Sequence, residues 1–147
     1  MASEHPRGAG AARRIRARAR AFLDALGRAE AELSVLVTTD RRIRGLNRRW
    51  RDIDRATDVL SFPLWEPPGS GPLLGDVVIS LDTAVRRARR DGRRLQEELD
   101  RYLAHGLLHL LGFDHGRPAE ARRMARREAE LIRAEGLLGS APRRRAE

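Results

Sequence analysis

Apolar residues follow two different spacings along this chain, and the two spacings alternate. Short runs rich in β-branched residues, each bounded by turn-forming residues or a proline, predict strands. Longer segments in which apolar residues recur every three or four positions predict helices. The predicted strands are residues 33–40, 58–62 and 76–81. The predicted helices are residues 11–26, 41–51, 82–91, 95–111 and 118–135.

The order of these elements indicates the fold class. Strands and helices are mixed along the chain, and a loop rich in proline and glycine, residues 64–75, separates the second and third strands. This order predicts an α/β fold of the α+β type, in which a small mixed sheet of three to four strands is packed with helices. Asp82 or Thr83 is expected to cap the helix that follows the third strand.

Length and composition predict one globular domain. The chain has 147 residues, of which 41% are hydrophobic, and this is enough for one core. We assign the domain to residues 11–138 and expect disordered tails at residues 1–10 and 139–147. No apolar run approaches the ~18 residues that cross a bilayer, so no membrane partner is expected. The arginine-rich start is compatible with a mitochondrial transit peptide and equally with an ordinary first helix.

The charge of the chain points to a polyanionic partner. There are 30 basic and 21 acidic residues, which give a formal net charge of +9. Every basic residue is an arginine, and codon bias in a GC-rich genome would explain that choice but not the excess of basic residues. Nucleic acid is therefore the first candidate partner. The absence of cysteine excludes disulfides and thiolate metal sites, and it fits a cytoplasmic protein without requiring one.

Three of the four histidines lie close together in the sequence, at and just after the end of a predicted helix. His105 and His109 are four residues apart, so they share one helix face and can bind one ion. Gly112 is the residue expected where a helix stops in a left-handed turn, and such a turn directs His115 back toward the other two. Three imidazoles without thiolates suit Zn²⁺ and leave a fourth coordination position open, as in catalytic zinc sites.

The spacing of these histidines also matches the metzincin zinc proteases, H-E-x-x-H-x-x-G-x-x-H. In this chain Gly106 stands where those peptidases have the glutamate that acts as general base. A peptidase needs that base to activate the attacking water, so the sequence argues against peptide hydrolysis.

The string HGLLHLLGFDH, residues 105–115, resembles H-G-x-L-H-L-x-G-x-D-H, the signature of the YbeY family of bacterial rRNA-maturation endoribonucleases. Residues 46–63 and 73–80 are similar to two further blocks of that family, and the resemblance spans about residues 33–136. It implies a single zinc ion bound by the three histidines and a mixed α/β fold. It also implies a role in processing ribosomal RNA, notably the 3′ end of 16S rRNA.

Arg51 is the candidate for stabilising charge on a phosphate. It matches an arginine near the metal site in the resembling family, and its guanidinium can stabilise the negative charge that develops during phosphodiester cleavage. The alternative is that Arg51 is one more solvated surface arginine among the 30 basic residues.

Several other polar side chains have both a functional and a structural interpretation. Asp114 could orient a metal ligand or accept a proton, or it could simply cap the turn after the helix. Asp76 could face the site or cap a turn, and Thr57 and Ser61 could hold phosphates or complete a turn and an edge.

Two tryptophans could serve as stacking platforms for single-stranded RNA. Trp65 lies in the predicted loop. Trp50 lies four residues after Leu46, and this helical spacing predicts that it belongs to the core.

These observations predict a zinc-dependent, single-strand endoribonuclease that acts in rRNA maturation. Ribosomal RNA and a small-subunit ribosomal protein are the expected partners. Two alternatives stay open: a non-catalytic, zinc-stabilised module that binds RNA or the ribosome, and a metal hydrolase of another phosphate ester.

Overall fold

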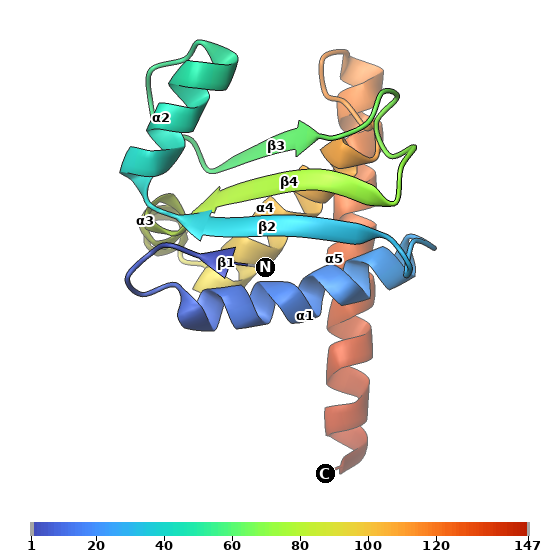
Figure 1. The fold of residues 1–147 in the computed structure, drawn as a ribbon. Helices are drawn as coiled ribbons and strands as arrows, with labels where there is room; N and C mark the ends of the chain where they lie inside the picture. The colour runs from blue at the N-terminus through green and yellow to red at the C-terminus, as the bar shows by residue number, and fades with distance from the viewer. Residues whose placement is uncertain (1, 147) are drawn as a thin grey trace.

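A computed structural model describes residues 2–146 of the chain, and side chains for residues 2–133 (Figure 1). The strands are β1 (Ala2–Ser3), β2 (Glu32–Thr38), β3 (Val59–Pro63) and β4 (Leu73–Ser80). The helices are α1 (Ala9–Ala25), α2 (Asp40–Arg51), α3 (Leu81–Asp91), α4 (Leu95–Leu110) and α5 (Pro118–Ala146). The predicted end of the last helix and the predicted tail at residues 139–147 lie outside the part whose side chains are described.

The strands form one mixed sheet in the order β1-β2-β4-β3. β2 is parallel to both β1 and β4, whereas β3 is antiparallel to β4 because the loop between them reverses the chain. The predicted fold class, an α+β domain with a small mixed sheet, is confirmed. β3 lies at an edge of this sheet, and this position leaves one side of the strand open.

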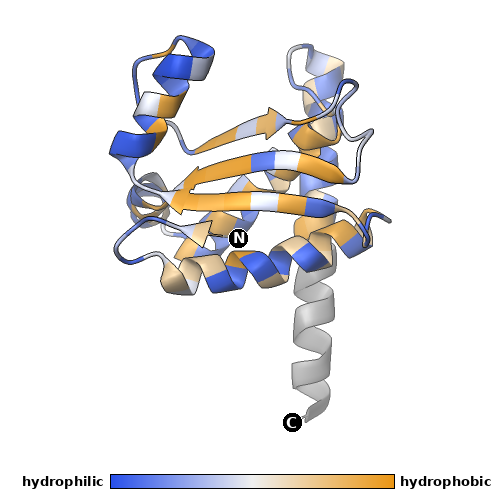
Figure 2. Ribbon diagram, viewed as in Figure 1, coloured by the Kyte–Doolittle hydropathy of each residue, from blue (hydrophilic) through white to orange (hydrophobic). Residues whose placement is uncertain are grey.

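The main core lies between the sheet and α4. In the view of Figure 1, α4 and α5 lie behind the sheet and α1 runs beneath its β1 edge. Leu103 and Leu107 of α4 are fully buried against Val77 and Ile79 of β4, and Phe22 of α1 completes this layer. Figure 2 shows the strands as mostly hydrophobic, as expected for a buried sheet. Because α4 packs at the centre of this core, the position of its backbone is defined by its contacts with the sheet.

α2 packs on the other face of the sheet, at the end where β2 stops (Figure 1). Its Ile43 is fully buried and forms a second small cluster with Leu60 and Val78. Thr39 caps the helix by accepting a hydrogen bond from the backbone N–H of Arg42. α2 therefore ends beside β3, and this brings its last residues to the sheet edge.

Residues 2–5 make regular contacts with the sheet and α3, within the stretch 1–10 that was expected to form a disordered tail. Ala2 and Ser3 pair with β2, and the N–H of Glu4 donates to the carbonyl of Val37 at 2.9 Å. The imidazole of His5 lies 2.8 Å from Asp82. A strand of two residues is too short to show a periodic pattern in the sequence, so it could not be predicted. Its pairing gives β2 a partner along an edge that would otherwise be open.

α3 begins one residue earlier than predicted, and its cap is Ser80 instead of Asp82 or Thr83. Asp40, at the start of α2, accepts hydrogen bonds from Ser80 and Thr83 and pairs with Arg86. Burial alone would raise the pKa of Asp40, but these hydrogen bonds outweigh it and lower the pKa below the ordinary value of 3.8. The network ties the starts of α2 and α3 to the end of β4.

Candidate metal centre

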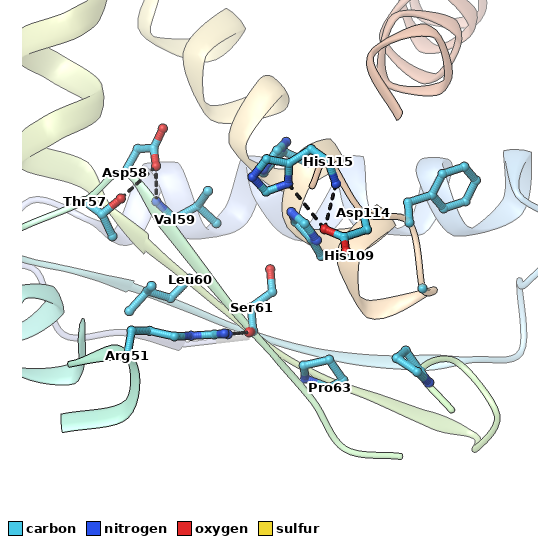
Figure 3. Close-up of a pocket in the computed structure, with 14 residues that line it drawn as sticks. Arg51, Thr57, Asp58, Val59, Leu60, Ser61, Pro63, His109, Asp114 and His115 are labelled. Carbon is cyan, nitrogen blue, oxygen red and sulfur yellow. Dashed lines mark hydrogen bonds and ion pairs between the residues drawn. The ribbon is translucent and has the colours of Figure 1, made fainter. Parts of the chain in front are cut away.

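The three clustered histidines converge on one point. His105 and His109 project from one face of α4, and His115 approaches them from the following loop (Figure 3). One nitrogen of each imidazole lies within 4.8 Å of the others. The ring centroids are 4.7 Å apart for His105 and His109, and 4.9 Å apart for His109 and His115. The sequence predicted that these three side chains lie close enough to bind one ion, and their positions in the structure agree with this.

A turn centred on Gly112 directs the chain back toward the helix. Gly112 has φ +99°, in the left-handed region that favours glycine. Its N–H donates to the carbonyl of His109, and the N–H of Phe113 donates to the carbonyl of Leu108, both at 3.0 Å. These two bonds form a Schellman motif, which satisfies the last carbonyls of α4. The helix end predicted from Gly112 is present, and it positions His115.

The donor set fits a zinc ion. Tetrahedral zinc with Zn–N bonds of about 2.0–2.1 Å places its ligand nitrogens about 3.3 Å apart, so small side-chain rotations would close the present spacing. Metal binding also requires neutral imidazole. Burial lowers the pKa of His109, and the neighbouring His105 and His115 lower it further. The neutral form of this ligand is therefore favoured near pH 7.

The histidines form one side of a cleft of about 580 Å³. Figure 3 shows His109, His115 and Asp114 on this side, with β3 and the end of α2 opposite. Asp114 is exposed, and its carboxylate accepts the backbone N–H of His115 at 2.7 Å. This backbone hydrogen bond, with a second one from Gly116, lowers the pKa of Asp114. Asp114 thus caps the turn and also borders the cleft.

Arg51 lies on the opposite side of the cleft, at the end of α2. Its guanidinium donates a hydrogen bond to the Ser61 carbonyl at 2.5 Å and lies 5.3 Å from the centre of the Phe62 ring. The side chain therefore reaches the edge of β3 and borders the same space as the histidines. Thr57 and Ser61, the weaker candidates from the sequence, also line this cleft.

Gly106 lies at a close approach between α4 and the sheet. A Cβ atom at this position would lie 2.8 Å from a methyl carbon of Val77 and 3.1 Å from the Ser61 hydroxyl. That hydroxyl donates to the Gly106 carbonyl at 3.1 Å. The site therefore has no room for the glutamate that metzincins carry here, in agreement with the argument against peptide hydrolysis.

Comparison with known proteins decides the family. A family model described as Endoribonuclease YbeY matches residues 8–136. This chain belongs to the YbeY family. It is 74% identical over 143 residues to Endoribonuclease YbeY of Anaeromyxobacter sp. strain Fw109-5, covering 97% of this chain and 74% of that protein.

A more distant relative agrees with this assignment, and one solved structure shares the fold. Endoribonuclease YbeY of Myxococcus xanthus is 53% identical over 137 residues, covering 91% of this chain and 47% of that protein. The solution structure of TM1509 from Thermotoga maritima superposes with a TM-score of 0.68 at 23% identity, covering 96% of this chain and 92% of that one. This structural likeness supports the fold alone.

For Asp76, facing the site and capping a turn were both open. Asp76 lies inside β4 and does not border the cleft, but lies with Phe62 and Trp50 around a separate hollow. The expectation that Trp50 belongs to the core was wrong. Trp50 is 60% exposed and is not part of the core. Leu46, one turn earlier, already contacts the small cluster under α2, so Trp50 projects past it and meets Phe62 only at the ring edge, 6.4 Å between centroids. Trp65 is also exposed, at 44%.

The sequence analysis missed two carboxylates that lie near the three clustered histidines. Asp58 borders the cleft and pairs with Arg87 of α3 at 2.7 Å. Glu128 of α5 lies 2.5 Å from Nδ1 of His105. The signal for Asp58 was its place at the start of a predicted strand, within a block that resembles the family. No local pattern indicated Glu128, because it is 23 residues from its partner.

Proposed function

We propose that this chain is a zinc-dependent, single-strand endoribonuclease that acts in rRNA maturation. The observation that carries the proposal is the cluster of three imidazoles on one side of an open cleft, with Arg51 on the other. Membership of the YbeY family supports the class of activity. The positive net charge supports a nucleic-acid substrate.

Arg51 is the residue that would bind the reacting phosphate. Its guanidinium is always charged, and one N–H is used by the Ser61 carbonyl, so the other donors are available to phosphate oxygens. The hydrogen bond and the Phe62 ring hold the guanidinium in place before substrate arrives, which is how a preorganised donor stabilises developing charge. When bound, zinc would act as a Lewis acid at the same phosphate.

Asp114 is the better candidate for accepting a proton in the cleft. Asp58 also borders the cleft, but its carboxylate is already paired with Arg87. Asp114 is exposed at the cleft and its carboxylate lies 3.9 Å from the His115 ring, so it can accept a proton or orient His115. A substrate phosphate must lie between the two sides of the cleft, and a strand whose bases are unstacked meets this requirement more easily than a duplex.

Ribosomal RNA near the 3′ end of 16S rRNA is the proposed substrate, and a small-subunit ribosomal protein is the proposed partner. The test is incubation of purified rRNA with the zinc-loaded protein, beside a chelator-treated sample, followed by mapping of the product ends. Cleavage at defined single-stranded sites that disappears with chelation is the expected result. Intact rRNA in both samples would refute the proposal.

Two rival functions make different predictions. A structural zinc module has four protein ligands, whereas the metal-binding group found among the described residues has three members. This favours an enzyme over a non-catalytic module. A hydrolase of another phosphate ester would cleave a small phosphodiester at a rate comparable with RNA, and we expect RNA to be strongly preferred.

A further inference from the structure

Glu128 reaches the metal centre from a different helix. Oε1 of its carboxylate lies 2.5 Å from Nδ1 of His105, and both side chains are partly buried. Met124 and Leu131, one turn before and one turn after Glu128, are 2% and 1% exposed and belong to the main core. These three residues share the face of α5 that packs on α4, so the position of the carboxylate is fixed from both sides.

We propose that Glu128 is a positioning residue for the metal centre. An ionised carboxylate can only accept hydrogen bonds, so its partner nitrogen, Nδ1 of His105, must carry the proton. The other ring nitrogen, Nε2, then has a free lone pair and is the atom available to a metal ion. Glu128 thereby selects the tautomer and the ring orientation of His105.

The charged residues around Glu128 do not compete with His105 for its carboxylate. Glu128 also borders a third hollow, distinct from the cleft and from the hollow beside Trp50. Several arginines line it, but each of them pairs with another carboxylate. The pairs are Arg87 with Asp58, Arg90 with Asp91, and Arg93 and Arg101 with Glu98. Within the described part of the chain, the partner found for the Glu128 carboxylate is His105.

The three metal ligands are held in three different ways. The His109 ring is hydrogen-bonded to the backbone at Phe113, within the turn that ends α4. His115 has the carboxylate of its neighbour Asp114 3.9 Å away. His105 alone among the three depends on a residue from a distant helix, so correct packing of α5 becomes a requirement for a complete metal site.

This inference rests on the metal-binding part of the proposed function and is independent of the reaction. The first measurement is the zinc dissociation constant of the full-length chain, from competition with a chromophoric chelator. We expect Glu128→Ala to weaken zinc binding by about 10–100-fold, the range for loss of a partner that orients a ligand. Glu130→Ala is the matched control, because Glu130 lies on the same helix, pairs with Arg127 and borders neither hollow that contains the histidines.

The second measurement is the tautomer of His105 in the metal-free protein, read from the nitrogen NMR shifts of its ring. We expect the proton on Nδ1 in the parent. Glu128→Gln should give a mixture of tautomers with little change in fold, because an amide can donate as well as accept. An unchanged tautomer in Glu128→Gln, or zinc binding within two-fold of the parent in Glu128→Ala, would overturn the proposal. A parent that binds zinc but leaves RNA intact would refute the proposed reaction and not this role.

Discussion

Arg51→Ala tests whether the guanidinium acts on the substrate. The side chain is exposed at the end of α2, and its contacts are one backbone carbonyl and the Phe62 ring. Truncation leaves the Ser61 carbonyl at an open cleft, where water can replace the lost donor. We therefore expect the free energy of unfolding to change by about 1 kcal/mol or less and the zinc content to stay unchanged.

The effect on cleavage should be much larger than the effect on stability. Loss of one preorganised donor to the transition state lowers the rate by about 10²–10³, or about 3–4 kcal/mol. Arg51→Lys should recover only part of this, because an ammonium group cannot make the planar, two-point contact of a guanidinium. The assay is single-turnover cleavage of a labelled single-stranded RNA by zinc-loaded protein.

Arg41→Ala is the matched control, since Arg41 is an exposed arginine on the same helix that does not border the cleft. It should cleave within a few-fold of the parent at moderate salt. If Arg51→Ala also cleaves within a few-fold, or if it is inactive only because zinc has been lost, Arg51 does not have the proposed role.

Three further outcomes follow from the structure. His109→Ala should reduce bound zinc from one ion per chain to near zero, and equal metal in variant and parent would exclude this ligand set. Gly106→Ala should destabilise the fold by about 1–3 kcal/mol in denaturant titration, because the added methyl overpacks the contact between α4 and β4. The lowered pKa of Asp40 means that its stabilisation is complete above pH 3.8 and is lost as the pH falls through the folded value. The stability difference between the parent and Asp40→Asn should therefore shrink in acid, and a difference that grows would contradict this sign.

The sequence alone was sufficient to predict those features of the structure that a local pattern of residues determines. The spacing of His105 and His109, followed by Gly112, defines a shared helix face and a helix stop within a few residues of one another. Both follow from backbone geometry, so they could be predicted without tertiary information. The strand positions were readable for the same reason, because short β-branched runs pack well only in a sheet.

The remaining features depend on contacts between distant parts of the chain. The strand formed by Ala2 and Ser3 exists because β2 offers an edge, and two residues carry no periodicity of their own. The exposure of Trp50 depends on how far α2 extends past the sheet. The need for a glycine at position 106 follows from the close contact with Val77, which lies in a distant strand. Helical spacing predicts which residues share a face, but not where the neighbouring element ends.

The edge position of β3 has a consequence for self-association. An edge strand presents unpaired backbone groups to which a strand of another molecule can add. In this chain the Ser61 carbonyl already accepts a hydrogen bond from Arg51, and Pro63 at the end of β3 has no N–H to donate. Arg51, the residue proposed to bind phosphate, thus covers one acceptor of this open edge, so its removal should raise the tendency to form oligomers at high concentration. Light scattering of Arg51→Ala beside its parent measures this effect, and equal scattering from the two proteins would contradict it.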